Sequence, residues 1–512
     1  MRYSIIIFFL INVFSWGQPN MQPKKVTEKF FPEFDDLEEV TPGVIKTRGY
    51  TNYGELISFL EYYLKKFPNN LSIEYIGTSQ KGYKIPMVRL YGNSAPKIKV
   101  WFQAGLHGNE SASTEGMLYL IHQILEKSIK TLDDLEISIV PMANIDGYLK
   151  TSRYSNNGLD LNRDNTKLMA PETIALKKAF NRFSPHVAVD FHEYAPFRRD
   201  YANFGKTGIS SPYDVMFLVS GNLNIPKNLR DYSNEVFLKN AQDVMTDYGY
   251  RFRPYVSTTK VNNEIHFNQS GFNSRSNATS FALTNCVSAL IEVRGVRIGK
   301  ESFKRRIRIT YLIAMSFLNS SLHEMEMIKK QIEIASNDRK DIIVKSERKI
   351  YQDAIQVIDL FSNSMTELSV TIRDASNPIP ILTRKRPESY VISANEKKVF
   401  DKLSALGIFY NLINEPKEII VEKYIVTDYK RANKKIEKML TQKLTTKIIK
   451  DTLVLPLGSI IVPTNQKNSN LIYELLEPEA PNSFFSWGII RTNLNETLPV
   501  YRIPKNLSHE KN

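Results

Sequence analysis

Apolar residues recur in two alternating rhythms along the first 300 or so residues of the chain. Over residues 51–68 they fall at helical spacing, and this run stops at Pro68. Residues 98–104 form a short apolar run typical of a buried strand, and residues 113–128 return to the helical period. Strands that alternate with helices predict an α/β fold, here a twisted mixed, mainly parallel sheet flanked by helices. Further strands are predicted over residues 71–77, 85–92, 135–144, 186–194 and 287–295, and a further helix over residues 170–183.

The pattern changes after about residue 300. Residues 304–335 predict one long helix, and residues 350–505 hold short β-like runs with one helical piece. The α/β alternation is therefore assigned to a first domain over residues 46–325. A helical connector and a smaller β-rich domain are predicted over residues 326–512, since a chain of this length exceeds one ordinary core.

The N-terminus has the pattern of a secretory signal peptide. A short positive start at Arg2 precedes an apolar stretch that is too short to span a membrane, and small residues stand at Ser15 and Gly17. We predict a cleaved signal peptide over residues 1–17, a lead-in segment over residues 18–45, and a secreted or periplasmic protein. No other long apolar run follows, so no integral membrane segment is expected after cleavage.

Composition narrows the class of protein. Hydrophobic residues make up 42% of the chain and charged residues 24%, as in soluble globular proteins. The net charge of +14 is spread along the chain without a nucleic-acid-binding motif, so no nucleic acid partner is expected. The single cysteine, Cys286, excludes an internal disulfide and a cysteine-based metal site.

Four residues able to bind a metal or carry protons follow predicted strands. His107 and Glu110 come after residues 98–104, His192 closes another strand, and Glu292 closes a third. The carboxyl ends of parallel strands meet at one edge of an open sheet, so these side chains are expected to lie together. Two histidines and a glutamate with an open fourth position are typical of catalytic zinc.

The other five histidines lack a partner at ligand spacing. The sequence His323–Met327 begins like a zinc-protease helix, but its last residue is methionine, so the H-E-x-x-H motif fails. Packing or surface roles are expected for the five, which are His122, His186, His266, His323 and His509.

A polar segment over residues 144–165 contains Arg153 and Arg163. An arginine guanidinium can bind a carboxylate through two parallel hydrogen bonds, so this segment is a candidate for substrate recognition. A second basic stretch, Phe197–Asp200, follows His192. We interpret it as a solvated loop, with a preference for acidic substrates as the alternative.

Five short motifs occur in a fixed order: HGNE, NIDG, GLDLNRD, DFH and IEVRG. With them, roughly residues 45–320 resemble the zinc metallocarboxypeptidase family of the carboxypeptidase A/B type. Residues 350–505 resemble, more loosely, a C-terminal extension found on some bacterial members.

This resemblance implies a metal site with one Zn²⁺ per chain. His107, Glu110 and His192 match the zinc ligands of the family. Asp160 matches an acidic residue that holds one of the ligand histidines from behind.

The resemblance also implies the residues that handle substrate. Asn162 and Arg163 match the pair that grips the terminal carboxylate, Arg153 matches the arginine that polarises the scissile carbonyl, and Glu292 matches the general base. The family also has a mobile tyrosine in the loop before that base. Here the corresponding loop, residues 264–285, contains no tyrosine.

The function predicted is that of a zinc metallocarboxypeptidase, which hydrolyses the C-terminal peptide bond of a peptide with a free terminal carboxylate. One alternative is a zinc amidohydrolase acting on peptidoglycan stem peptides or N-acyl amino acids. A second is a non-catalytic binding protein on the same scaffold.

Overall fold

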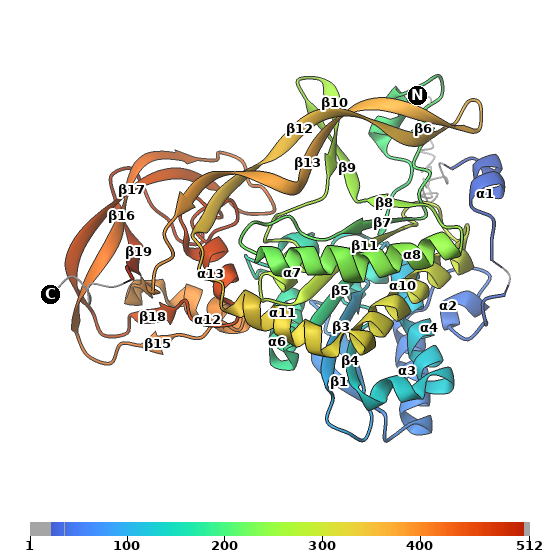
Figure 1. Cartoon of the computed structure of the whole chain (residues 1–512), viewed down its shortest axis with the longest axis horizontal. Coiled ribbons are helices and arrows are strands. Elements are labelled where there is room, and N and C mark those ends of the chain that lie inside the picture. The colour runs from blue at the N-terminus through green and yellow to red at the C-terminus, as the bar shows by residue number, and fades with distance from the viewer. Residues whose placement is uncertain (1–21, 35, 506–512) are drawn as a thin grey trace, which may run out of the picture.

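The computed structural model describes residues 22–34 and 36–505 (Figure 1). The predicted signal peptide lies outside the described residues. Among the helices of the described part, none combines the length and the apolar character needed to cross a bilayer.

A large mixed sheet forms the centre of the first 330 residues or so, which confirms the predicted α/β architecture. Its four central strands, β4, β3, β5 and β11, run parallel. Strand β1 pairs antiparallel with β2, β2 with β4, and β7 with β11, whereas β8 runs parallel to β7. In sheet order the strands are β1 (Leu71–Thr78), β2 (Lys84–Leu90), β4 (Leu135–Val140), β3 (Ile98–Ala104), β5 (Val187–Tyr194), β11 (Val287–Arg294), β7 (Val215–Leu218) and β8 (Phe252–Pro254).

Helices cover both faces of this sheet, and two aromatic side chains of β3 illustrate why. Trp101 packs edge-on against Phe180, and the neighbouring Phe102 packs edge-on against Phe191. Successive side chains of a strand point to opposite faces, so each face of β3 buries its own aromatic cluster. Helices α6 (Pro171–Phe183) and α9 (Asn277–Ala282) meet through Phe180, whereas α4 (Ser111–Lys127) and α10 (Phe303–His323) pack on each other and on β3.

Local signals set the helix ends. Helix α3 (Tyr53–Lys66) begins with a capping box in which Asn52 and Glu55 exchange side-chain and backbone hydrogen bonds. The single helix predicted over residues 304–335 is wrong. The chain forms two helices there, because the backbone leaves the helical region at Glu324, whose carboxylate accepts a hydrogen bond from the Tyr232 hydroxyl at 3.1 Å.

The remaining helices have 12 residues or fewer, and α5 and α13 among them are buried along their whole length. They are α1 (Lys24–Phe30), α2 (Pro42–Ile45), α5 (Ile145–Tyr148), α7 (Lys227–Tyr232), α8 (Lys239–Asp247), α11 (Met325–Ser336), α12 (Lys397–Ala405) and α13 (Ser469–Leu476).

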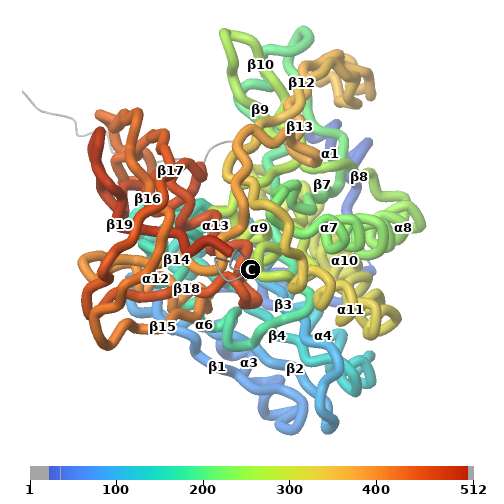
Figure 2. Tube along the Cα trace, turned by 60° about the vertical axis from the view of Figure 1, so that its left-hand side comes forward, coloured from blue at the N-terminus to red at the C-terminus, as the bar shows by residue number. Residues whose placement is uncertain are grey.

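The predicted β-rich region is present as a separate sheet beside the first unit (Figure 2). Its largest pairing joins two long strands in an antiparallel ribbon, and an apolar cluster continues from the first sheet to residues such as Tyr390 and Phe484. The strands, in order, are β15 (Asn411–Leu412), β18 (Ile460–Pro463), β14 (Ser389–Ile392), β19 (Thr497–Ile503), β16 (Lys417–Arg431) and β17 (Gln442–Leu455).

A third sheet combines strands from both halves of the chain. The long ribbon of β12 and β13 reaches over the first unit in Figure 1, and β13 pairs in parallel with β10. The prediction of a loop over residues 264–285 is wrong for part of that range, because residues 264–269 form β10 and residues 277–282 form α9. In order the strands are β6 (Ile209–Ser210), β12 (Ile342–Asp359), β13 (Ser364–Arg384), β10 (Glu264–Gln269) and β9 (Val256–Val261).

Candidate active site

The register of the central sheet brings the predicted site residues to one edge. Ala104, the last residue of β3, pairs with Phe191, and the next residue of β5, His192, pairs with Glu292 of β11. The segment carrying His107 and Glu110 begins directly after Ala104. Three strands thus deliver these four side chains to the same edge of the sheet, as expected for parallel strands.

Glycines shape the segment after β3. Gly105 adopts φ +63°, a left-handed conformation that costs glycine little. A Cβ atom at Gly108 would lie 2.0 Å from the carbonyl carbon of Gly147, so only glycine fits there. This close approach accounts for the glycines of the HGNE and NIDG motifs, because Gly108 of the first motif packs directly against Gly147 of the second.

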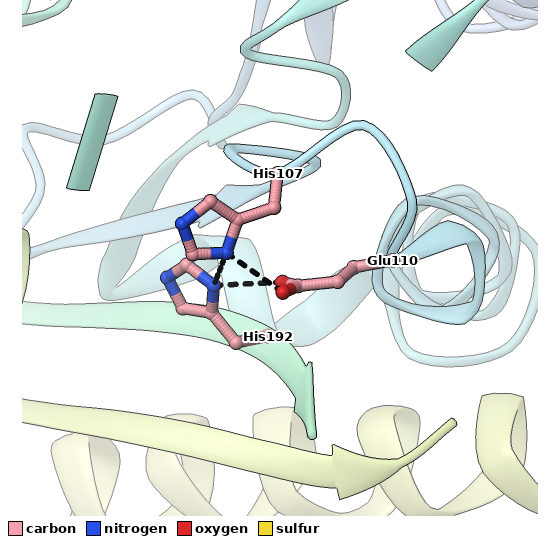
Figure 3. A group of neighbouring side chains, drawn as sticks. All are labelled: His107, Glu110 and His192. Carbon is pink, nitrogen blue, oxygen red and sulfur yellow. Dashed lines mark hydrogen bonds and ion pairs between the residues drawn. The ribbon is translucent and has the colours of Figure 1, made fainter. Parts of the chain in front are cut away.

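Two imidazoles and one carboxylate converge on a single point (Figure 3). The Nδ1 atoms of His107 and His192 lie 3.1 Å apart, and each lies 2.7 Å from a different carboxylate oxygen of Glu110. All three side chains are buried. Burial alone would raise the pKa of Glu110, but the two histidines outweigh it and hold this pKa well below its usual range.

The Nε2 atom of each imidazole contacts a second carboxylate. His107 Nε2 lies 3.2 Å from Asp160 Oδ1, and His192 Nε2 lies 2.8 Å from Asp190 Oδ2. A ring whose Nε2–H is donated to a carboxylate presents the lone pair of Nδ1 to the cluster, which is the usual arrangement behind metal-binding histidines. The donor set therefore fits Zn²⁺, which favours two imidazoles and a carboxylate with one position left open.

Asp160 was predicted to stand behind a histidine, whereas Asp190 was missed. The signal was present in the sequence, because Asp190 and His192 are two apart on one strand and so face the same side.

Arg153 lies beside the cluster. Its Nε donates to Asp160 Oδ2 at 3.0 Å, and its Nη1 lies 3.8 Å from Glu110 Oε1. Although burial opposes it, the nearby carboxylates raise the pKa of Arg153, so its positive charge is secure.

The predicted carboxylate-binding pair lies in a 3₁₀ turn, Leu161–Arg163. Asp160 accepts a hydrogen bond from the Asn162 N–H at 2.9 Å, and the Asn162 side-chain oxygen accepts one from the Asn277 N–H at 2.7 Å. Arg163 donates to the Asn162 carbonyl at 2.8 Å. Within the described residues Arg163 forms no ion pair, and its guanidinium lines the cavity described below.

Glu292 is buried, and burial raises the pKa of its carboxyl to about 7. No hydrogen bond or ion pair within the described part of the chain engages this carboxyl. Glu193, which adjoins His192, is different: it accepts two hydrogen bonds from the Arg306 guanidinium, at 2.6 and 2.8 Å, and one from the Ala112 N–H. Glu193 is therefore tied into the fold, and Glu292 is free to exchange a proton.

A cavity of about 1030 Å³ opens at this edge of the sheet. Tyr255, which precedes β9, also lines it and was not recognised from the sequence. The predicted residues that line the cavity are His107, Arg153, Asn162, Arg163 and Glu292.

The other histidines of the described chain stay outside the cluster. His122 Nδ1 lies 2.6 Å from the Tyr63 hydroxyl oxygen, and His186 Nδ1 accepts a hydrogen bond from the Lys99 N–H. Among residues 22–34 and 36–505, His107, Glu110 and His192 form the one group of three or more potential ligands.

Comparison with known proteins relates the chain to carboxypeptidases. Residues 56–204 match the family model described as zinc carboxypeptidase. Carboxypeptidase 2 of Trichophyton rubrum is 29% identical over 441 residues, which cover 83% of this chain and 81% of that protein. Human carboxypeptidase B2 is 26% identical over 136 residues, 22% of this chain and 32% of that protein.

Among solved structures, a metallo-carboxypeptidase from Burkholderia cenocepacia aligns with a TM-score of 0.42 and 16% identity, covering 53% of this chain and 69% of that one. The match to the family model and the long alignment with carboxypeptidase 2 agree with the motifs that resemble this family. Residues 56–204 therefore match a zinc carboxypeptidase domain, and the similarity to carboxypeptidase 2 supports a peptide-bond hydrolase.

Proposed function

We propose that the protein is a zinc-dependent metallocarboxypeptidase that removes the C-terminal residue of peptides. One Zn²⁺ per chain would be held by His107, Glu110 and His192. The observation that carries this proposal is that the cavity reached by His107 of the histidine–glutamate cluster is also lined by Arg163 and by Glu292, whose carboxyl is unengaged. A proposed metal ligand, a proton acceptor and a cation that can bind the substrate's terminal carboxylate thus line the same cavity.

Zn²⁺, when bound, supplies a Lewis acid that makes water nucleophilic near neutral pH. Glu292 takes the proton of the attacking water and then passes it to the nitrogen of the departing residue. Arg153 faces the oxygen of the scissile carbonyl and stabilises the negative charge that develops there. One donor of this kind typically contributes about 3–4 kcal/mol to a transition state.

Asn162 and Arg163 hold the terminal carboxylate of the peptide. Burying a carboxylate is costly unless it is paired, and a guanidinium supplies both charge and direction. The idea that Arg163 merely braces its loop through Asp164 is less well supported. Asp164 instead accepts hydrogen bonds from the backbone N–H groups of Met169 and Ala170.

The N-terminal pattern supports export, so the substrates would be met in the periplasm or outside the cell. None of the reacting groups named above belongs to residues 22–34, 36–45 or 326–505.

The test is metal-dependent release of a C-terminal amino acid from a blocked dipeptide. Removing zinc with a chelator should abolish release, and adding Zn²⁺ back should restore it. His107→Ala and His192→Ala should each lose bound zinc, whereas His323→Ala, an exposed control, should retain it.

Two outcomes would contradict the proposal. Zinc bound at this cluster without any hydrolysis would indicate a binding protein. Turnover confined to muropeptides or N-acyl amino acids would indicate an amidohydrolase.

A further inference from the structure

We propose that the enzyme prefers peptides with acidic side chains on the N-terminal side of the scissile bond. The cations that would recognise them are Arg199, Lys260 and Arg297. This inference rests on the proposed carboxypeptidase function and assigns its substrate class.

The three cations come from three segments that contact one another beside the cavity. Arg199 follows β5, Lys260 lies on β9, and Arg297 follows β11, and all three line the cavity. The first two segments are joined by a hydrogen bond from Arg198 Nε to Thr258 Oγ1 at 2.8 Å. The third joins them where the Tyr194 carbonyl accepts a hydrogen bond from the Val296 N–H at 3.1 Å.

Another part of the cavity lining is already assigned to the C-terminal residue of the substrate. There Asn162 is fixed by Asn277, and the small apolar cluster of Leu218, Ala278 and Leu290 packs under Tyr255. A peptide whose terminal carboxylate meets Arg163 and whose scissile bond lies at Glu292 must place its upstream residues in the remaining space. That space is the part of the cavity lined by the three cations.

The charge on this side is not compensated by the protein. Within the described residues, the side chains of Arg199, Lys260 and Arg297 form no hydrogen bond and no ion pair, and all three residues are exposed. Of the nearby acids, Asp200 is shared with Arg198, at 3.5 Å, and Glu193 is occupied by Arg306. Cations gathered at the wall of a cleft raise the local concentration of anionic ligands, so these three would attract carboxylate side chains.

The first experiment measures kcat/KM for blocked peptides that share one C-terminal residue. The two residues before it are both Glu, both Gln or both Lys. At low ionic strength the Glu peptide should exceed the Gln peptide by about tenfold, because each exposed ion pair adds only a modest amount. Raising the salt concentration should narrow this ratio, since salt screens exposed charges. Equal values for Glu and Gln peptides would overturn the inference while leaving the carboxypeptidase function intact.

The second experiment reverses the charges. The triple variant Arg199→Glu, Lys260→Glu, Arg297→Glu should invert the ratio, so that the Lys peptide becomes the better substrate. A matched triple, Lys65→Glu on α3, Lys127→Glu at the end of α4 and Lys130→Glu just beyond it, changes the net charge equally but lies outside the cavity. It should leave the ratio unchanged. If both triples shifted the ratio alike, net charge rather than this cluster would be responsible, and the inference would be wrong.

A binding measurement separates this inference from the proposed reaction. Calorimetry with zinc-loaded Glu292→Gln should give tighter binding of the Glu peptide than of the Gln peptide, whether or not the wild type turns either over. A stronger preference for acidic muropeptides than for the all-L Glu peptide would overturn the assignment to peptides. Failure of the proposed function would appear differently, as no release of a C-terminal residue from any peptide.

Discussion

At the scale of single residues, the carboxylates that contact the two imidazoles decide which ring nitrogen faces the proposed zinc. Asp190→Asn and Asp160→Asn should each weaken zinc binding by about 10–100-fold, because the ring loses the acceptor that fixes its tautomer and orientation. Competition with a zinc-binding dye measures this directly. Asp353→Asn, on the exposed surface of β12, is the control and should bind zinc like the wild type. Unchanged affinity in both site variants would mean that these carboxylates serve the fold alone.

Glu292 and Glu193 provide a second contrast at this scale. Glu292→Gln keeps the shape of the side chain and removes the proton acceptor, so turnover should fall by roughly 10²–10⁴ while zinc content and Tm stay the same. Steady-state kinetics and thermal unfolding together test this. Turnover near that of the wild type would place the general base elsewhere.

Glu193→Gln should behave in the opposite manner. It leaves the buried guanidinium of Arg306 without its partner, so the free energy of unfolding should fall by about 3–5 kcal/mol. Denaturant titration measures this loss. A stable Glu193→Gln protein that had lost only turnover would contradict the structural role assigned here.

At the scale of elements, the turn between β16 and β17 supports the substrate-binding segment. Glu437 in this turn pairs with Arg275, at 2.7 Å, and with the buried Lys167, and Lys438 donates to the carbonyl of Asn157. Two of the contacted residues, Asn157 and Lys167, precede and follow Asn162 and Arg163 in the sequence. The β-rich region therefore fixes the segment that carries the proposed carboxylate-binding pair.

Glu437→Gln should therefore raise KM for a free-acid peptide severalfold, with a smaller change in kcat, since the variant loosens binding rather than chemistry. Zinc content should not change. Glu437→Asp should restore part of the affinity, and Glu418→Gln, an exposed residue of β16, should have no effect. An equal fall of kcat in Glu437→Gln would argue that the turn supports the reacting groups instead.

The same scale shows what local patterns can predict. Apolar runs predict β3, β5 and β11, and the candidate site residues lie at or just after the carboxyl ends of these strands. Asp190 could also have been inferred, since it shares a face with His192. The break at Glu324 and the strand at Glu264–Gln269 could not, because they depend on contacts with residues far away in the chain.

At the scale of the whole molecule, the pairing of segments that are far apart in the chain cannot be predicted from the sequence pattern. The parallel pairing of β10 with β13 and the contacts of Glu437 join residues more than 100 positions apart. The periodicity of the sequence does not predict such contacts. The division of the chain into residues 46–325 and 326–512 stays a prediction. The third sheet and the largest apolar cluster both cross that boundary.

The central claim is that this cavity recognises a free terminal carboxylate beside a catalytic zinc. The most direct measurement compares cleavage of one peptide as the free acid and as its C-terminal amide, by the wild type and by Arg163→Ala. The wild type should cleave the acid and largely ignore the amide. Arg163→Ala should lose most of its activity on the acid, mainly through weaker binding. The difference in activity between the acid and the amide should therefore be smaller for this variant. Cleavage of the amide or of internal bonds as readily as the free acid by the wild type would contradict the carboxypeptidase account.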